Sequence, residues 1–147
     1  MKINHHQKEI CRLLNYQFKS NRLLEEALTH SSARKSSKAN NERLEFLGDR
    51  VLGLIIAEEL LRLNPNSTEG QIATYYNYLV KKETCALIAK GIGLEKLLTL
   101  GKSVTRTSNR QKDKILGNAV EALIGALFLD AGFKTSKEIV LKVWRKQ

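Results

Sequence analysis

The sequence is poor in the features that mark secreted, membrane and repeat proteins. Its 147 residues include one proline and two cysteines, Cys11 and Cys85, which have no CxxC context. We therefore expect two buried, reduced thiols rather than a disulfide or a zinc site. The N-terminal MKINHHQKEI has no apolar signal core, and the longest apolar runs are too short to span a bilayer. A cytoplasmic protein without a membrane segment is expected.

Negative charge is also scarce. The chain has 25 Lys and Arg against 15 Asp and Glu, a formal net charge of +10. Such a surplus favours binding to phosphate backbones or anionic membranes, and nucleic acid is the better explanation here. A hydrophobic fraction of 42% indicates a globular chain, and its length fits one domain over residues 1–147.

The acids that are present include a group with helical spacing. Residues 41–63 read NERLEFLGDRVLGLIIAEELLRL, in which Glu42, Glu45 and Asp49 are three and four residues apart. This spacing places the carboxylates on one stripe of an α-helix. Apolar residues surround the stripe, so we expect this helix in the core and its acids beside a compensating partner.

A further acid stands alone in an apolar run. Residues 119–129 read AVEALIGALFL, where only Glu121 is neither apolar nor glycine. An unpaired ionised carboxylate would be costly there, so it should be neutralised, paired or bound to a cation. Two acid-bearing helices packed together would suit Mg²⁺, which prefers oxygen ligands. The alternative is pairing with lysines or arginines, and Arg43 and Arg50 are nearby in sequence.

Every other apolar pattern has helical spacing, so the expected fold class is all-α. Capping-box spacing at Thr68–Gln71 and at Thr135–Glu138 predicts two helix starts. Glycines on the two acid-bearing helices would let them approach closely. The expected helices lie around residues 10–14, 23–28, 41–63, 68–91, 119–129 and 135–144.

Two stretches carry a resemblance to a known family. NERLEFLGDRVL at residues 41–52 resembles the signature of the ribonuclease III family, and KILGNAVEALIGALFLD at residues 114–130 is similar to its second metal-binding helix. Shorter matches follow the family's order along the chain. They are LTHS at 28–31, Glu69–Gly70, Leu79–Val80 and AGF at 131–133. The resemblance implies the helical fold of a ribonuclease III endonuclease domain.

The resemblance also implies a function and a site. It implies a homodimeric, Mg²⁺-dependent endoribonuclease, with Mn²⁺ able to substitute, that cuts double-stranded RNA during rRNA or mRNA processing and leaves 5′-phosphate and 3′-hydroxyl ends. Catalytic roles fall to Asp49 and Glu121. The implied metal ligands are Glu45, Asp49, Asn118 and Glu121, with accessory acids at Glu42 and Glu69. Candidate dimer contacts are Phe46, Leu47, Val51 and Leu54, for which ordinary core packing is an equal explanation.

Two departures leave alternatives open. Asn118 stands where the family has an aspartate, and an amide oxygen carries no formal charge. The alternative function is therefore a catalytically weakened or inactive double-stranded-RNA-binding module on the same fold. Bacterial relatives commonly continue into a double-stranded-RNA-binding domain, which is not expected within this chain. A basic DNA-binding regulator is less favoured, because it would leave the acids without a purpose.

Basic residues precede the second acid-bearing helix. Residues 102–114 are polar, and we expect them to form a flexible loop that holds a phosphodiester strand, although a merely solvated loop would look the same. The candidate RNA-binding residues are Arg106, Arg110, Lys112 and Lys114. Two other features have a structural explanation beside a functional one. Glu69 suits the positive end of a helix dipole as well as an accessory role at the metal site, and the tyrosines at 75, 76 and 78 suit packing better than stacking on bases.

Overall fold

Helices make up the fold. The computed structural model describes residues 2–36, 38–104 and 106–147, and this part of the chain holds seven α-helices and two short 3₁₀ helices but no strand. The expected all-α class is therefore confirmed. The α-helices are α1 (His5–Leu14), α2 (Asn21–Ala27), α3 (Glu42–Leu63), α4 (Glu69–Val80), α5 (Lys82–Gly91), α6 (Asn109–Ala131) and α7 (Phe133–Trp144); the 3₁₀ helices are η1 (Leu94–Leu97) and η2 (Lys102–Val104).

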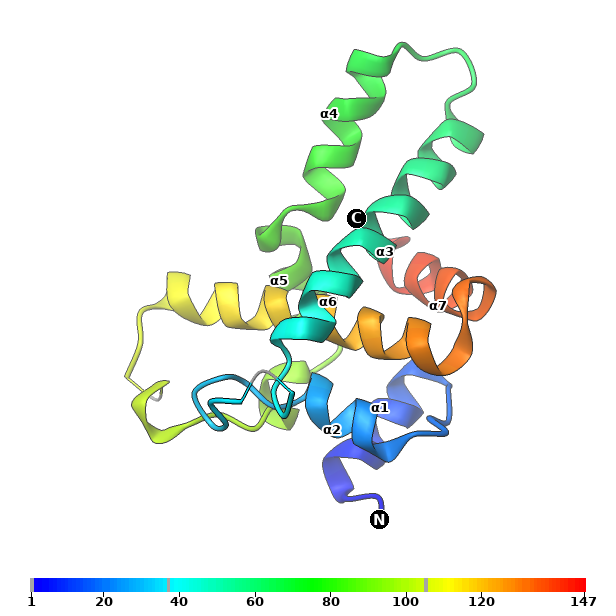
Figure 1. The fold of residues 1–147 in the computed structure, drawn as a ribbon. Coiled ribbons are helices and arrows are strands. Elements are labelled where there is room, and N and C mark those ends of the chain that lie inside the picture. The colour runs from blue at the N-terminus through cyan, green and yellow to red at the C-terminus, as the bar shows by residue number, and fades with distance from the viewer. Residues whose placement is uncertain (1, 37, 105) are drawn as a thin grey trace.

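The core is centred on the crossing of α3 and α6 (Figure 1). In α6, Ile115–Gly117 and Ala119–Leu127 are buried, so this helix is apolar on nearly every side. Three further helices pack against α6, with α5 along one flank and α2 and α7 near its end. The apolar run at residues 119–129 thus lies in the core except at its end, where Leu129 is 55% exposed.

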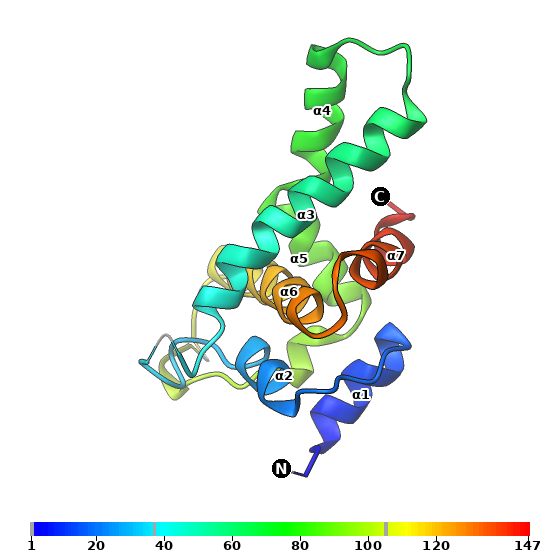
Figure 2. The same ribbon diagram turned by 45° about the vertical axis from the view of Figure 1, so that its right-hand side comes forward.

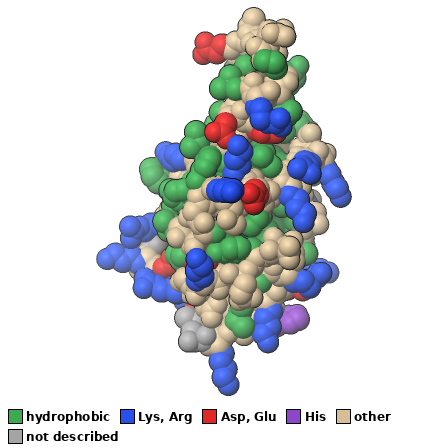
Figure 3. All heavy atoms as spheres, turned by 90° about the vertical axis from the view of Figure 1, so that its right-hand side faces the viewer, with side chains coloured by type: hydrophobic (Ala, Val, Ile, Leu, Met, Phe, Trp, Pro, Cys, Tyr) green, Lys and Arg blue, Asp and Glu red, His purple; other side chains and the backbone are tan. Residues whose placement is uncertain are grey.

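The second half of α3 and the whole of α4 project from this body as an arm (Figures 1 and 2). No residue of α4 is buried. At its base, the indole N–H of Trp144 donates to the carbonyl of Leu79 at 2.9 Å. On the face in Figure 3, hydrophobic side chains run along the arm and onto the body between Lys and Arg. The arm therefore exposes apolar surface that the monomer does not cover, including Leu61, Leu63, Tyr75 and Tyr78.

Two expected helix boundaries were wrong. The single helix expected over residues 68–91 is broken at Lys81, whose ψ of 156° is extended. The carbonyl of Tyr78, freed by the break, accepts a hydrogen bond from the buried hydroxyl of Thr84 at 2.6 Å. The last helix begins at Phe133 after Gly132, which has φ of 83°, and so does not use the Thr135–Glu138 box. The capping box at Thr68 and Gln71 is confirmed.

Both cysteines are buried and free, as expected. Burial, reinforced by the negative charge of Glu121, raises the pKa of Cys85 to about 12, so its thiol stays protonated at neutral pH. Within the described residues, no helix combines the length and the hydropathy needed to cross a bilayer.

Candidate functional site

The two acid-bearing helices touch through their backbones. A Cβ atom on Gly48 of α3 would lie 1.6 Å from the backbone oxygen of Glu121, and one on Gly125 of α6 would lie 2.2 Å from that of Leu44. Only glycine fits at either position, since real Cβ atoms do not approach that closely. Gly48 and Gly125 therefore bring the two helices together, as expected of glycines on them. Two other glycines of these helices have different neighbours, since Gly53 faces Tyr76 and Gly117 faces Lys82.

Lys82 joins the acids of the two helices. Its ammonium lies 3.5 Å from Oε1 of Glu45 and forms a second, shorter ion pair with Oε2 of Glu121. The side chain of Glu121 is 2% exposed, whereas that of Lys82 is 41% exposed. A buried carboxylate is thus compensated by a cation that reaches it from the surface.

The sequence alone did not point to Lys82 as a residue of the site. Lys82 is the first residue of α5, where the positive end of the helix dipole disfavours a cation. The helix start at Lys82 is itself known only from the structure, because the sequence predicts one helix over residues 68–91. Which acids these are depends on the packing of three helices, which no local pattern contains.

The charges perturb one another. Burial raises the pKa of Glu121; Lys82 opposes this, Asp49 and Glu45 add to it, and the result is about 7. Burial lowers the pKa of Lys82, but the hydrogen bond and charge of Glu121, with the charge of Glu45, outweigh it and raise the pKa overall. The acids of α3 therefore share one electrostatic environment with Glu121.

Asp49 has a different partner. One of its oxygens lies 3.2 Å from the guanidinium of Arg50, which also stacks 3.7 Å from the ring centroid of Phe46. The Asp49 side chain is 52% exposed, so this surface pair is weak and readily exchanged. The alternative of pairing with Arg50 is thus found for Asp49, while Lys82 pairs with the two glutamates.

Asn118 presents an oxygen beside Glu121. It lies one helical turn before Glu121 on α6, so both point from the same stripe. Its Oδ1 atom is buried and has no hydrogen-bond partner within the described part of the chain. A buried acceptor without a donor is unfavourable, and a cation is one way to satisfy it.

The accessory acids lie at different distances from this cluster. Glu42 is exposed at the start of α3, one turn before Glu45. Glu69 is exposed at the start of α4, near the tip of the arm. Lys82 follows the other end of α4, a helix that is about 18 Å long at 1.5 Å per residue. In the described chain, then, Glu69 is remote from Glu45 and Glu121.

The basic residues are placed differently from expectation. A flexible loop was expected, but α6 begins at Asn109 and Ser108 caps it. Arg110, Lys112 and Lys114 are therefore helical, and Arg106 alone of the four lies before the helix. All four are exposed. Lys114 lies one turn before Asn118 on the stripe that leads to Glu121, so this helix carries positive charge up to the acids.

The donor set fits a hard divalent cation. It offers carboxylates of Glu45, Asp49 and Glu121 and the unsatisfied amide oxygen of Asn118, all oxygen donors of the kind that Mg²⁺ prefers. Lys82 already places one positive charge between two of them. In residues 2–36, 38–104 and 106–147, however, no three His, Cys, Asp or Glu side chains converge with the geometry of a metal site. Among these residues, then, the expected three-acid pocket is not formed: Glu45 and Glu121 meet at Lys82, and Asp49 pairs with Arg50.

Comparisons with known proteins identify the family by sequence. The profile of the family described as Ribonuclease-III-like matches residues 20–146. The chain is 46% identical over 147 residues to Ribonuclease 3 of Dinoroseobacter shibae, covering 100% of this chain and 64% of that protein. It is 47% identical over 131 residues to Ribonuclease 3 of Rhodobacter capsulatus, covering 89% and 58%. The chain thus spans less than two thirds of these relatives.

Solved structures of the same family have the same fold as this chain. Two structures of the nuclease domain of ribonuclease III from Campylobacter jejuni each match with a TM-score of 0.86. One is 37% identical and covers 95% of this chain and 96% of that one; the other is 36% identical and covers 97% and 96%. By sequence and by fold, the chain therefore belongs to the ribonuclease-III-like family and has the architecture of its nuclease domain.

Proposed function

We propose that the chain is the nuclease domain of an endoribonuclease that hydrolyses double-stranded RNA with Mg²⁺, or with Mn²⁺ in its place, and leaves 5′-phosphate and 3′-hydroxyl ends. The observation that carries this proposal is the meeting of Glu45 and the buried Glu121 around one ammonium group, beside the unsatisfied oxygen of Asn118. Processing of rRNA or mRNA is what the family resemblance implies, and a cytoplasmic location is what the sequence predicts; both stay predictions.

The residues of the site would have different roles in the reaction. Glu45, Asp49, Asn118 and Glu121 would hold the metal, which when bound would make water nucleophilic near neutral pH and stabilise charge on the phosphoryl oxygens. Arg106, Arg110, Lys112 and Lys114 would bind the phosphate backbone without reading sequence. The ammonium of Lys82 is positioned to neutralise an anion that approaches Glu45. The outer acids, Glu42 and Glu69, keep the accessory role as a prediction.

The second candidate function is a catalytically weakened RNA-binding module, which Asn118 favours. An Asn118→Asp variant adds a negative charge one turn from Glu121, and we expect tighter Mg²⁺ binding and duplex cleavage faster by about tenfold or more. Cleavage of a long RNA duplex with Mg²⁺ by both chains provides the measurement. Activity in the unaltered chain supports the proposal, rescue by the variant alone identifies Asn118 as the disabling residue, and inactivity of both supports the binding module.

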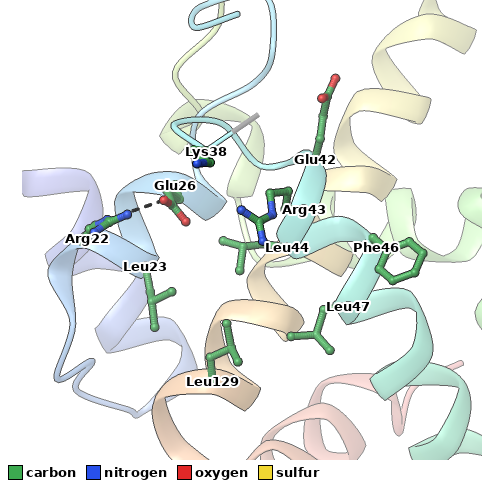
Figure 4. A pocket seen from close by; sticks show the side chains of 10 residues that line it. All are labelled: Arg22, Leu23, Glu26, Lys38, Glu42, Arg43, Leu44, Phe46, Leu47 and Leu129. Carbon is green, nitrogen blue, oxygen red and sulfur yellow. Dashed lines mark ion pairs between the residues drawn. The ribbon is translucent and has the colours of Figure 1, made fainter. Parts of the chain in front are cut away.

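We further propose that the domain acts as a homodimer through the face carrying Phe46. The side chain of Phe46 is 63% exposed, and it borders a surface hollow of about 870 Å³. Figure 4 shows leucines from α2, α3 and α6 pointing into this hollow, among them Leu23, Leu47 and Leu129. One of the two C. jejuni structures is described as showing flexibility in a region involved in dimer formation. An exposed aromatic ring beside a hollow that has leucines inside and charged residues of both signs around it would suit a two-fold contact.

Replacing Phe46 with serine should therefore convert the dimer to a monomer without unfolding the chain, because an exposed ring adds little to the monomer core. Sedimentation velocity at several concentrations should show the dissociation constant of the dimer raised by about tenfold or more. Leu87→Ser is the control, since Leu87 is 55% exposed on α5. A Phe46→Ser chain that stays dimeric, or an unaltered chain that is already monomeric, would refute this interface.

A further inference from the structure

A hydrogen-bonded junction connects the segment before α3 to the segment before the basic residues. It consists of Thr29, His30 and Ser32 on one side and Thr99 and Gly101 on the other. The backbone N–H of Thr99 donates to the carbonyl of Leu28 at 2.8 Å, and that of His30 donates to the carbonyl of Thr99 at 2.9 Å. These bonds form the isolated parallel bridge between Thr29 and Thr99. None of these residues has a part in the site described above.

The His30 side chain completes the junction. The backbone N–H of Ser32 donates to Nδ1 of His30 at 3.1 Å, so this nitrogen is unprotonated and the neutral ring carries its proton on Nε2. The Ser32 hydroxyl lies 2.7 Å from the same nitrogen and donates to it. Its oxygen in turn accepts the backbone N–H of Gly101 at 2.8 Å. His30 thus orients Ser32, and Ser32 fixes Gly101.

Gly101 has no room to move toward Ser32. A Cβ atom at this position would lie 2.2 Å from the carbonyl oxygen of Ser32, so the two backbones are in direct contact. Gly101 immediately precedes η2, from which the chain continues through Arg106 into α6. The junction therefore fixes the start of the segment that carries Arg106 toward α6.

The other side of the junction holds the acid-bearing helix. The carbonyl of Thr29 accepts the backbone N–H of Asn41 at 2.9 Å, and Oδ1 of Asn40 accepts that of Glu42 at 3.0 Å. The charges of Glu42 and Glu45 act on His30, although burial outweighs them and lowers the pKa of its imidazole. The start of α3 and the segment that leads to the basic stretch are thus both hydrogen-bonded to the same segment, residues 28–32.

We propose that His30 and Ser32 are positioning residues for RNA: through Gly101 they hold the chain that carries Arg106 at a fixed place relative to the acids of α3. Arg106 is the one of the four basic residues that lies before α6, and it completes a basic stretch whose other members, Arg110, Lys112 and Lys114, are held by α6 itself. This inference rests on the proposed function, because it assumes that the basic stretch binds a phosphate backbone. It assigns the junction a role in substrate affinity rather than in the chemical step, since the bonds from Asn40 and Thr29 that hold α3 do not pass through Ser32.

Four variants test the proposal. Ser32→Ala and His30→Leu remove the bond to Gly101 or the group that orients it, whereas His30→Asn keeps an acceptor where Nδ1 lies. The control is Tyr16→Phe, which loses the 2.8 Å bond from the Tyr16 hydroxyl to Asp130 at the opposite end of α6. The probe is a labelled RNA duplex of about 25 base pairs, which is long enough for the basic stretch to contact several phosphates. For each chain, we would measure the Kd for this duplex in EDTA at several salt concentrations. We would then measure kcat and KM for its cleavage in Mg²⁺.

We expect Ser32→Ala and His30→Leu to raise Kd and KM by about five- to tenfold and to flatten the salt dependence, because fewer phosphates are contacted at once. Values of kcat should stay within about twofold of the unaltered chain, and His30→Asn and Tyr16→Phe should bind normally. Amide hydrogen exchange over residues 98–104 should be faster in Ser32→Ala and unchanged in Tyr16→Phe.

Three results would overturn the inference. One is normal duplex binding by Ser32→Ala when the unaltered chain also binds, which leaves the proposed function intact. Another is a His30→Asn chain as impaired as His30→Leu, since orientation of Ser32 would then not explain the effect. The third is an unaltered chain that neither binds nor cleaves the duplex, which contradicts the proposed function as well.

Discussion

Glu121→Gln should reduce cleavage of duplex RNA by a factor on the order of 10² to 10⁴, the range lost when a group acting in the transition state is removed. Glu121 is the buried carboxylate of the site, and its replacement by an amide of the same shape removes the negative charge that would bind the metal. The amide oxygen can still accept a hydrogen bond from Lys82, so the packing of α3, α5 and α6 should persist. Single-turnover cleavage at saturating protein gives the rate of the chemical step.

Stability in EDTA provides the control for this variant. Because the pKa of Glu121 is raised to about 7, the folded chain keeps a proton that the unfolded chain releases above the ordinary value of 4.5. The free energy of unfolding contributed by this group should fall as the pH rises from about 4.5 to about 7. Glu121→Gln should lack that decline in urea unfolding. Cleavage at the unaltered rate by this variant would remove Glu121 from the catalytic set.

Gly48→Ala should cause the largest loss of stability among the substitutions considered. The new Cβ would lie 1.6 Å from the backbone oxygen of Glu121, and no rotation of a side chain can relieve a contact with backbone. Helices α3 and α6 would have to separate, at a cost of ~3 kcal/mol or more in the free energy of unfolding. Urea unfolding measures this directly, and cleavage should be lost because the acids move apart.

Gly70→Ala is the matched control. Gly70 lies in the exposed α4, and a Cβ atom there would meet nothing within 4 Å. Alanine has the higher helix propensity, so the free energy of unfolding should be unchanged or higher by up to ~1 kcal/mol. If Gly48→Ala were as stable as Gly70→Ala, the close crossing of α3 and α6 would not be what holds the acids together.

The sequence predicted the parts of the site that depend on local pattern. Glu42, Glu45 and Asp49 could be placed on one helical stripe because their spacing alone defines it, and α3 covers Glu42–Leu63 as expected from residues 41–63. Glu121 could be singled out because a lone acid in an apolar run needs compensation. The all-α class follows from the same helical periodicity.

The parts that depend on tertiary contacts could not be predicted. The break at Lys81 lacks a Gly or Pro signal, and the compensating bond from Thr84 exists only in the folded chain. Lys82 meets Glu45 and Glu121 because α3, α5 and α6 converge, across 37 and 39 residues of sequence. The loop expected over residues 102–114 is shorter than predicted, because α6 already begins at Asn109. Its N-cap, Ser108, does not stand out in a sequence where most neighbours are polar.

We expect the acids of α3 and α6 to bind a divalent cation where Lys82 now supplies the positive charge. Anomalous diffraction from crystals grown with Mn²⁺ tests it most directly. We predict an anomalous peak in contact with carboxylate oxygens of Asp49 and Glu121, with the ammonium of Lys82 displaced from Glu121. The contrary result is a Lys82 that still bridges Glu45 and Glu121, with no Mn²⁺ peak between the two helices.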